Sequence, residues 1–342
     1  MAGVYFSFFS LILIPLSLLL ILYIIVRPKP SRIPLKNRHV FITGGSSGIG
    51  LALANLCAHH GADVTLLARD VKKLEEAKQS IKLATGRDVK VFSADVRDYD
   101  AVSRVVEEAG PIDVLVCNHG VFVPHELADQ KVDEIKFMLD VNLMGTFHLI
   151  RAALPGMKKD RAERGPGSIA IMSSQAGQVG IYGYTAYSAS KFGLKGLAEA
   201  LQQEVIADNI HVSLIFPPDT ETPGLAEALD DLGFTSFVVS FSHPVYKTKR
   251  RPQLTSIIAA SSGAMKADEV AKKSLDGIQS GSFVVSCNFE GFLLSIATAG
   301  LSPQRSYLLA FVEVMTAGII RLVGLFFQWN WYGSIEKWHS KK

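Results

Sequence analysis

A tyrosine and a lysine four residues apart, Tyr187 and Lys191 in the run YSASK, are the side chains best suited to chemistry in this sequence. Residues at positions i and i+4 lie on the same face of a helix, so the two side chains are expected to be neighbours. A phenol with a pKa of about 10 exchanges protons poorly near neutral pH, but a nearby ammonium stabilises the phenolate and lowers that pKa. The pair therefore predicts an acid–base centre. Taken alone, the pentapeptide would fit a solvated pair on a helix surface.

A glycine-rich turn, TGGSSGIG at residues 43–50, lies between an expected strand and an expected helix. Glycines permit a tight turn and a close approach of the backbone to a pyrophosphate, which the helix N-terminus then stabilises. The residues expected to contact the cofactor here are Gly44, Ser46, Ser47, Gly48, Ile49 and Gly50. The turn and the Tyr–Lys pair in one chain favour a dinucleotide-dependent enzyme over a surface pair.

The residue that follows the second expected strand indicates which dinucleotide binds. A site that prefers NAD places Asp or Glu there, to bind the adenosine ribose hydroxyls. This chain has Arg69, with Lys73 following. A guanidinium pairs with a 2′-phosphate that a carboxylate would repel. The sequence therefore predicts NADPH, against the alternative that Arg69 is an ordinary surface residue.

The third and fourth expected strands end in residues that suit the same pocket. Asp95 and Val96 follow the third strand, where they are placed to contact the adenine. Asn118 and Gly120 follow the fourth strand, where small or polar residues let the backbone line the cofactor pocket.

Between residues 38 and 290, short apolar runs rich in β-branched residues alternate with amphipathic helical stretches. The runs expected to be strands are residues 39–43, 63–68, 89–94, 113–117, 168–173, 211–216 and 282–287. This alternation predicts an α/β fold with a doubly wound parallel sheet of the Rossmann type. We take residues 38–290 as one NADPH-binding catalytic domain.

Residues 225–266 break the alternation and are expected to form an insert that covers the substrate, since such loops follow the carboxyl ends of strands in open α/β sheets. Its apolar residues Phe234, Phe237, Val238, Val239 and Phe241 are expected to line a path for an alkyl chain. The basic run at 247–251 is expected to contact anionic lipid headgroups. The alternative is that the apolar residues fill the core and the basic run is a solvated loop.

The N-terminus is apolar, since residues 4–26 carry no charge. As a helix this segment would be about 35 Å long at ~1.5 Å per residue, enough for a hydrocarbon core of about 30 Å. A cleaved signal peptide needs a basic start, a shorter apolar run and a small-residue cleavage site, which this segment lacks. Residues 1–27 are therefore predicted to be a membrane anchor, and the proline-containing residues 28–37 a stiff linker.

The charges after this anchor predict the side of the membrane on which the catalytic domain lies. The flanking cations are Arg27, Lys29, Arg32, Lys36 and Arg38. Basic flanks stay in the cytosol, so the catalytic domain is expected to face the cytosol.

Residues 291–342 are also apolar and are expected to associate with the membrane. The segment at 291–301 is short, and the segment at 307–331 contains Glu313 and Arg321, which are costly at the bilayer centre. Two interfacial or re-entrant helices, two full spans, and an ordinary buried helix of the catalytic domain all stay open.

Composition excludes several other classes of protein. The three cysteines, Cys57, Cys117 and Cys287, are widely spaced and form no C-x-x-C pair, which argues against a disulfide framework and against a zinc site. We expect no metal. The net charge of +3 is too small to indicate nucleic acid as a partner. A homo-oligomer is compatible with the sequence.

Together these motifs resemble the short-chain dehydrogenase/reductase superfamily over about residues 38–225, through TGGSSGIG, the Asn-x-Gly turn, Asn142 in DVNLMG, and SS…YSASK. The resemblance implies that Tyr187 donates or accepts the proton, that Lys191 holds the nicotinamide ribose and lowers the Tyr187 pKa, and that Asn142 orders a water in the proton relay. Ser174, about thirteen residues before the tyrosine, would polarise the substrate carbonyl. Ser173 is the alternate.

The sequence departs from the family pattern at two places near the expected nicotinamide pocket. The family's usual Asn-Asn-Ala-Gly is replaced by a run that has His119 at its third position, and its usual Pro-Gly after the sixth strand is Pro217-Pro218 here. In the second stretch we expect Pro217, Thr220 and Thr222 to contact the cofactor.

A closer resemblance links residues 173–205 and the stretch PPDTETPG at 217–224 to the 3-ketodihydrosphingosine reductases (3-dehydrosphinganine reductases) of sphingolipid synthesis. It implies reduction of 3-ketodihydrosphingosine, a long-chain keto-lipid, to dihydrosphingosine by NADPH. It also implies residence on the endoplasmic reticulum membrane. One alternative is an anchored steroid or retinoid dehydrogenase, which shares the anchor and the Tyr–Lys pair. A second is a non-catalytic NADPH-binding membrane scaffold, which would be expected to lack Tyr187 or Lys191.

Overall fold

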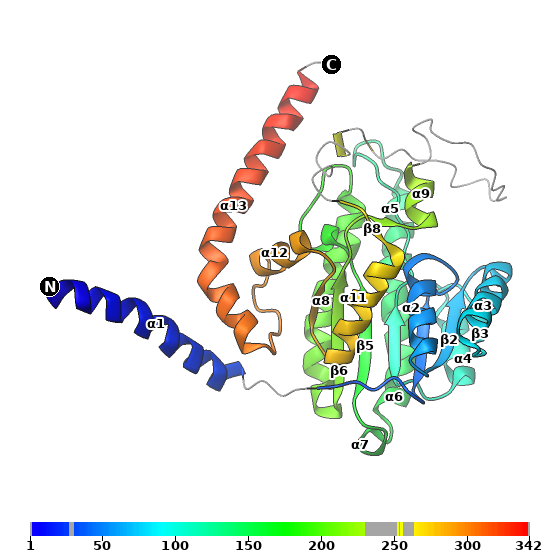
Figure 1. Cartoon of the computed structure of the whole chain (residues 1–342). Helices are drawn as coiled ribbons and strands as arrows, with labels where there is room; N and C mark the ends of the chain where they lie inside the picture. Colours follow the sequence, from blue (N-terminus) through cyan, green and yellow to red (C-terminus); the bar gives the residue numbers. More distant parts are fainter. Residues whose placement is uncertain (1, 27–30, 230–251, 253, 256–262, 341–342) are drawn as a thin grey trace.

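The protein is built on a seven-stranded sheet (Figure 1), seen in a computed structural model that describes residues 2–26, 31–229, 252, 254–255 and 263–340. The strand order is β3-β2-β1-β4-β5-β6-β9, and every neighbouring pair is parallel. The strands are β1 (His39–Thr43), β2 (Asp63–Ala68), β3 (Lys90–Ser93), β4 (Val114–Cys117), β5 (Gly167–Met172), β6 (Ile210–Phe216) and β9 (Val284–Ser286). Each coincides with a run expected from the sequence, with its ends shifted by at most about two residues, so the doubly wound sheet is confirmed.

Helices cover both faces of this sheet. On one face α2 (Gly48–His59), α3 (Val71–Thr85) and α11 (Ala267–Ser280) pack on strand residues such as Val40 and Ile42. On the other face α4 (Tyr99–Ala109), α6 (Gly145–Lys158) and α8 (Thr185–Val205) pack on residues such as Phe41. Because both faces are covered, β4, β5 and β6 are buried at every position, and apart from His211 in β6 their residues are apolar or small.

Several shorter elements connect these strands and helices. They are α5 (Val132–Leu139), the π-helical turn η1 (Asp140–Met144), α7 (Arg161–Arg164), the 3₁₀ turns η2 (Gln175–Gly177) and η3 (Ile206–Asp208), α9 (Pro223–Leu229), and the two-stranded pair β7 (Thr220–Glu221) and β8 (Met265–Lys266).

The order of the strands fixes where a ligand can bind. β1 lies between β2 and β4, so the chain moves outward in one direction through β2 and β3 and then in the other direction from β4. The loops that follow β1 and β4 therefore lead away from each other. In open α/β sheets the crevice between such loops, at the carboxyl ends of the strands, is the place where ligands bind.

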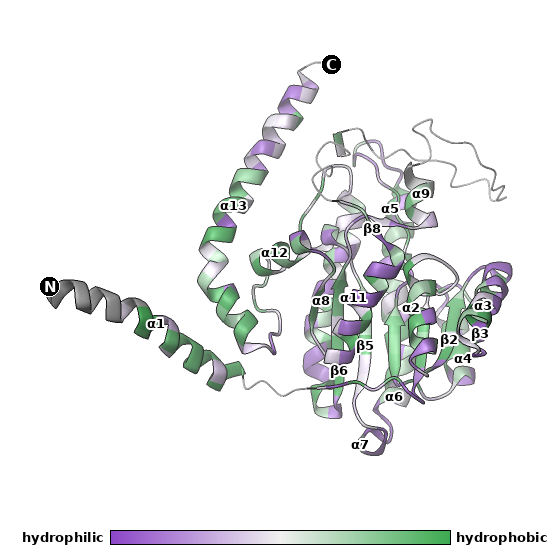
Figure 2. Cartoon of the chain, in the orientation of Figure 1, coloured by the Kyte–Doolittle hydropathy of each residue, from purple (hydrophilic) through white to green (hydrophobic). Residues whose placement is uncertain are grey.

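At the C-terminus two helices lie outside the sheet, α12 (Phe289–Ala297) and the 33-residue α13 (Tyr307–His339). Among the described residues, α13 is the helix that is long and apolar enough to cross a membrane, with a mean hydropathy of 2.0 over its best 18 residues. Only 6% of that window is buried inside the protein, so the alternative of an ordinary buried helix is wrong for this segment. Figure 2 shows its first half as predominantly hydrophobic.

At the N-terminus α1 (Ala2–Val26) also projects from the sheet domain (Figure 2) and contains Pro15. The apolar stretch identified among its described residues, Ile12–Val26, is shorter than a full span. Its end meets the start of α13, where the rings of Tyr23 and Tyr307 pack edge to face with centroids 5.5 Å apart. The N-terminal membrane anchor stays a prediction.

Part of the expected linker is packed rather than extended from the domain. Ile33 and Leu35 are buried in the core that α2 and α11 share, and the Ile33 amide donates to the Gln279 carbonyl over 2.8 Å. Apolar side chains two residues apart account for this, because one face of an extended segment can then lie on the domain. In the expected insert, residues 230–251, 253 and 256–262, including 234–241 and 247–251, lie outside the described residues.

Candidate active site

The carboxyl ends of β1, β4, β5 and β6 carry most of the side chains singled out from the sequence. Ser174 follows β5, and Tyr187 lies in the first turn of α8. Asn142 lies in the π-helical turn η1. Single π-helical turns inserted next to α-helices occur often at functional sites, and this one joins α5 to α6.

Tyr187 is partly buried among aromatic rings. The Phe122 ring packs edge to face against it, with centroids 4.7 Å apart, and the Tyr184 ring lies 6.0 Å away. Loss of hydration in these surroundings raises the pKa of Tyr187 to about 12, an effect that a hydrogen bond from the Ser174 side chain opposes. The expected lowering of the Tyr187 pKa by Lys191 is therefore not found. Desolvation of the phenolate outweighs the other influences on this hydroxyl.

The two candidate serines have different partners. Hydrogen bonding by the Ser174 side chain favours a lower pKa of Tyr187, and Ser174 Oγ accepts from the Ala176 amide over 3.2 Å. Ser173 is 3% exposed, and its Oγ donates to the main-chain carbonyl of Lys191 over 3.0 Å. The geometry thus joins Ser174 to the tyrosine hydroxyl and Ser173 to the backbone of α8.

Lys191 is buried in the same helix, one turn after the tyrosine. Its Nζ lies 5.7 Å from the centre of the Tyr187 ring and donates to the Met172 carbonyl over 2.9 Å. Burial lowers the pKa of Lys191 to about 8. An ammonium has three hydrogens to donate, so one protein carbonyl leaves it able to bind further oxygens.

Asn142 is completely buried and holds the loop after β4 in place. Its Oδ1 accepts from the Val121 amide over 2.7 Å, and its Nδ2 donates to the Val121 carbonyl over 3.0 Å. The same Nδ2 lies 3.0 Å from the Ser190 hydroxyl. Asn142 Oδ1 and Lys191 Nζ both lie within about 3.5 Å of where a side chain at Gly120 would begin, so the three residues meet.

The glycine-rich turn has the conformation that its sequence predicts. Gly44 and Gly48 have φ angles of 62° and 54°, in the left-handed region that favours glycine. At Gly50 an added Cβ would lie 2.2 Å from the Gly44 carbonyl oxygen, so a larger residue cannot fit. Asn118 Nδ2 donates to that same oxygen over 3.3 Å and ties the turn to the end of β4. Of the other residues expected here, Ser47 is the N-cap residue of α2, Ile49 packs on the core from α2, and Ser46 lies in the turn.

The stretch after β6 closes over this turn. A Cβ at Gly48 would lie 3.0 Å from the Thr222 methyl group, so Thr222 stands beside the glycine-rich turn. Thr220 is buried and donates to the Pro218 carbonyl over 2.8 Å, while the Pro217 carbonyl accepts from the Gln175 amide over 3.0 Å. The structure thus brings together the two stretches that were expected to contact the cofactor.

The residues expected around the adenosine end lie at the ends of β2 and β3. Arg69 is exposed after β2, and Lys73 lies in the first turn of α3, where its amide is capped by Asp70. Asp95 pairs with Arg97 over 2.7 Å, and although burial opposes it, hydrogen bonding to Arg97 lowers the pKa of Asp95. Val96 is buried, and its side chain lies against the Gly145 backbone. The Val96 carbonyl accepts a hydrogen bond from His148.

His119, recognised in the sequence only as a departure from the family, proves to be a structural part of the site. Its Nδ1 lies 2.8 Å from Thr43 Oγ1 at the end of β1, and its Nε2 lies 3.4 Å from Thr146 Oγ1 on α6. Burial and the neighbouring Lys191 charge lower the pKa of His119 to about 3, so the ring is neutral. Sequence reasoning also missed Arg97 and Gln175, whose partners depend on the loop conformations.

Comparison with known proteins gives a consistent result. The family described as short chain dehydrogenase matches residues 38–233. The 3-dehydrosphinganine reductase TSC10A of Arabidopsis thaliana is 62% identical, over 93% of this chain and 92% of its own length. The 3-dehydrosphinganine reductase of Danio rerio is 39% identical, over 91% of this chain and 90% of its own.

Among solved structures, the L-sorbose reductase of Gluconobacter frateurii, complexed with NADPH and L-sorbose, matches with a TM-score of 0.60 and 27% identity. The match covers 75% of this chain and 95% of that one. The resemblances drawn from the motifs, to the superfamily and to the 3-ketodihydrosphingosine reductases, are confirmed.

Proposed function

This chain belongs to the short-chain dehydrogenase/reductase family of oxidoreductases, and on that premise we propose that it uses NADPH to reduce the ketone of 3-ketodihydrosphingosine to dihydrosphingosine. The observation that carries the chemistry is the grouping of three side chains: the Ser174 hydroxyl acts on the Tyr187 hydroxyl, and the buried Lys191 Nζ lies over the Tyr187 ring, 5.7 Å from its centre. The names of the relatives at 62% and 39% identity supply the substrate.

The residues around the crevice fit a dinucleotide. Gly50 has no room for a Cβ because the start of α2 packs directly on the Gly44 backbone, and a turn this tight is the kind that brings a helix N-terminus to a pyrophosphate. The exposed Arg69 replaces the carboxylate of an NAD site and would pair with a 2′-phosphate. Asp95, Val96, Asn118 and Gly120 would line the pocket between these two points, and the bound NADPH would supply the hydride.

The state of Tyr187 suits the reducing direction. A phenol whose pKa is raised to about 12 carries its proton throughout the physiological range, so it is ready to protonate the alkoxide that forms from the ketone. Ser174 would donate to the same oxygen, and its bond to Tyr187 sets the two hydroxyls next to each other. Donors placed in advance at a developing oxyanion typically contribute about 2.7–4 kcal/mol.

Lys191 and Asn142 would act around that pair. The Lys191 ammonium uses the Met172 carbonyl and has hydrogens left for the ribose hydroxyls of a nicotinamide nucleotide. Both side-chain atoms of Asn142 hold the Val121 main chain, which fixes the loop on the side of the pocket towards Gly120. Because these two bonds to Val121 are retained, the proposed water of the proton relay would bind beside Asn142 without replacing either of them.

A lipid substrate accounts for the apolar ends of the chain. We propose that α13 and α1 hold the protein on the endoplasmic reticulum membrane with the sheet domain in the cytosol, as the basic residues after α1 indicate. A ketone on a long alkyl chain stays in the bilayer, so an anchored reductase meets it there. Protease treatment of sealed microsomes would test this orientation, because a sheet domain in the cytosol is digested whereas one in the lumen is protected.

Turnover by the purified full chain tests the function. The protein in lipid nanodiscs is mixed with NADPH and, in separate reactions, 3-ketodihydrosphingosine, a steroid ketone and retinal. We expect dihydrosphingosine to form fastest. Faster turnover of the steroid or of retinal would favour the anchored steroid or retinoid dehydrogenase, and NADPH binding without turnover of any carbonyl would favour the scaffold.

A further inference from the structure

The helix α12 is bonded to the turn that carries Ser174, although the two are more than a hundred residues apart in the chain. Gln175, next to Ser174, donates from Nε2 to Asn288 Oδ1 over 2.8 Å. Gln178, just after the turn, donates from Nε2 to Ser295 Oγ over 2.9 Å. Asn288 begins α12 and Ser295 lies near its end, so the turn is held along the helix at two points.

One oxygen atom of Asn288 accepts two hydrogen bonds. Besides the Gln175 amide, Asn288 Oδ1 accepts from the Gly291 main-chain amide over 2.8 Å, which makes Asn288 the N-cap of α12. A Cβ at Gly291 would lie 2.9 Å from Gln175 Nε2, so the glycine leaves space for the glutamine amide. The cap of the helix and its contact with the turn therefore depend on the same side chain.

Gln175 connects Asn288 to the turn that carries Ser174. It is 6% exposed, and its own main-chain amide donates to the Pro217 carbonyl over 3.0 Å. The next residue, Ala176, donates its amide to Ser174 Oγ, and the Gly177 amide donates to the Ser174 carbonyl over 2.8 Å. The position of the Ser174 hydroxyl thus follows the turn, and the turn lies fixed between the loop after β6 and α12.

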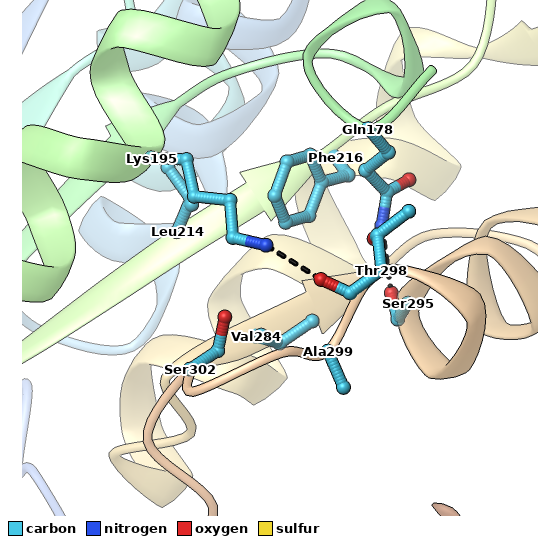
Figure 3. A pocket seen from close by; sticks show the side chains of 9 residues that line it. All are labelled: Gln178, Lys195, Leu214, Phe216, Val284, Ser295, Thr298, Ala299 and Ser302. Atoms are coloured by element: carbon cyan, nitrogen blue, oxygen red, sulfur yellow. Dashed lines mark hydrogen bonds between the residues drawn. The ribbon is translucent and has the colours of Figure 1, made fainter. Parts of the chain in front are cut away.

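The far end of α12 is fixed to the catalytic helix. Lys195, one turn after Lys191 on α8, donates from Nζ to the Thr298 carbonyl over 2.6 Å (Figure 3). Between α12, α8 and the strands β6 and β9 there remains a cavity of ≈ 10 Å³, about the space of one water molecule. Phe216 and Val284 line it beside Gln178, so α12 is closely seated here.

We propose that Asn288 is a positioning residue for the reduction: through Gln175 it holds the turn that carries Ser174, and so keeps the Ser174 hydroxyl beside Tyr187, where it can stabilise the oxyanion. The inference rests on the proposed function, because it assigns Ser174 the oxyanion. It also gives α12 a role of its own. The helix joins the catalytic turn to α13, on which it packs, and so links the apolar C-terminal end of the chain to the reacting centre.

Substitutions at Asn288 separate positioning from helix capping. Serine is an equally good N-cap residue, but its shorter side chain cannot reach Gln175 and still cap Gly291. Aspartate caps the helix and keeps an oxygen at the same reach. We expect N288S to lower kcat by about ten- to a hundredfold, since a displacement of about 1 Å can cost that much, while the Kd for NADPH stays within about twofold. We expect N288D to restore kcat to near the wild-type value.

The matched control is S302A, which removes another bond of the C-terminal region to α8, from Ser302 Oγ to Glu199 Oε1 at 2.5 Å. Ser302 lines the same small cavity as Gln178, but its hydroxyl bonds to α8 and not to the Ser174 turn. The kcat of S302A is expected to be unchanged. All variants are assayed as the full chain in nanodiscs with 3-ketodihydrosphingosine, beside the wild type and S174A. A wild type that does not reduce the ketone refutes the proposed function, whereas a Ser174-dependent wild type with an unimpaired N288S refutes only the positioning role.

Hydrogen exchange gives a readout that does not depend on the substrate. Peptides that cover residues 173–180 are expected to exchange faster in N288S than in the wild type, in N288D or in S302A, because the turn loses one of its two bonds to α12. Unchanged exchange in N288S, or an equal increase in S302A, would overturn the proposal whatever the enzyme reduces.

Discussion

Ser173 and Ser174 are adjacent, but the structure predicts that their replacement by alanine damages different properties. The Ser174 hydroxyl has one hydrogen to donate, and in the proposed mechanism Tyr187 and the oxygen of the substrate share it. Loss of a single oxyanion donor lowers kcat by about 10²–10³. Because Tyr187 remains as a second donor, we place S174A at the lower limit, a decrease of about a hundredfold or about 2.7 kcal/mol in the activation free energy.

For S173A the expected loss is in stability. The Ser173 hydroxyl donates to the Lys191 carbonyl, which as part of α8 also has a helical partner, so no acceptor is left without a hydrogen. The loss of one such bond costs about 1 kcal/mol, which lowers the melting temperature by about 2–4 °C in a domain of this size. We expect kcat to change less than about fivefold, because the alkoxide oxygen gains or loses no donor.

The assay follows NADPH oxidation by the full chain in nanodiscs with saturating ketone, and thermal unfolding is measured on the same preparations. The Kd for NADPH, from the change in fluorescence of the nicotinamide on binding, serves as the control for an intact cofactor site. If S173A lost a hundredfold in kcat while S174A kept its activity, the oxyanion role would belong one residue earlier and the hydrogen-bond argument would be refuted.

Four further changes test the cofactor site and the proton donor. Y187F is expected to bind NADPH normally and to lose about 10²–10⁴ in kcat, as measured in a single-turnover assay, because the general acid is gone. R69D should weaken NADPH by roughly tenfold or more relative to NADH, since repulsion of the 2′-phosphate replaces a charge-assisted bond; an unchanged ratio of the two Kd values would contradict the assignment. G50A should abolish NADPH binding while the sheet still folds, because its Cβ would meet the Gly44 carbonyl at 2.2 Å; titration and circular dichroism distinguish the two outcomes. The affinity for NADPH should fall as the pH rises through about 8, where Lys191 loses its charge, and a flat profile between pH 7 and pH 9, roughly a unit on either side, would exclude Lys191 from the binding site.

The sheet was predictable because its signal is local. Parallel strands covered on both faces must be apolar at nearly every position, so the runs around Ile42, Val116 and Ile171 stand out in the sequence. The glycine-rich turn was predictable for a similar reason: the left-handed φ angles at Gly44 and Gly48 suit almost no other residue. In both cases the physical requirement falls on single residues and their immediate neighbours.

Other features depend on contacts that no local pattern encodes. The bond between Gln175 and Asn288 joins two amides 113 positions apart, and either one would pass for an ordinary loop residue in the sequence. The burial of Ile33 and Leu35 depends on α2 and α11, which leave room for the segment before β1. His119 could be recognised from the sequence as a departure from the family pattern. Its contact with Thr43 is seen only in the structure.

The pKa of Tyr187 illustrates why composition and spacing were insufficient for the chemistry itself. The i, i+4 spacing placed Lys191 on the same face correctly, and from proximity alone a lower tyrosine pKa followed. In the structure the ammonium donates to the Met172 carbonyl, and the phenol is enclosed by Phe122 and Tyr184, so desolvation of the phenolate is the larger effect. Burial acts on both partners and favours the neutral form of each, which raises the pKa of the phenol and lowers that of the amine. In the proposed mechanism the Lys191 ammonium therefore binds the ribose of the cofactor, and the protonated Tyr187 donates its proton to the alkoxide.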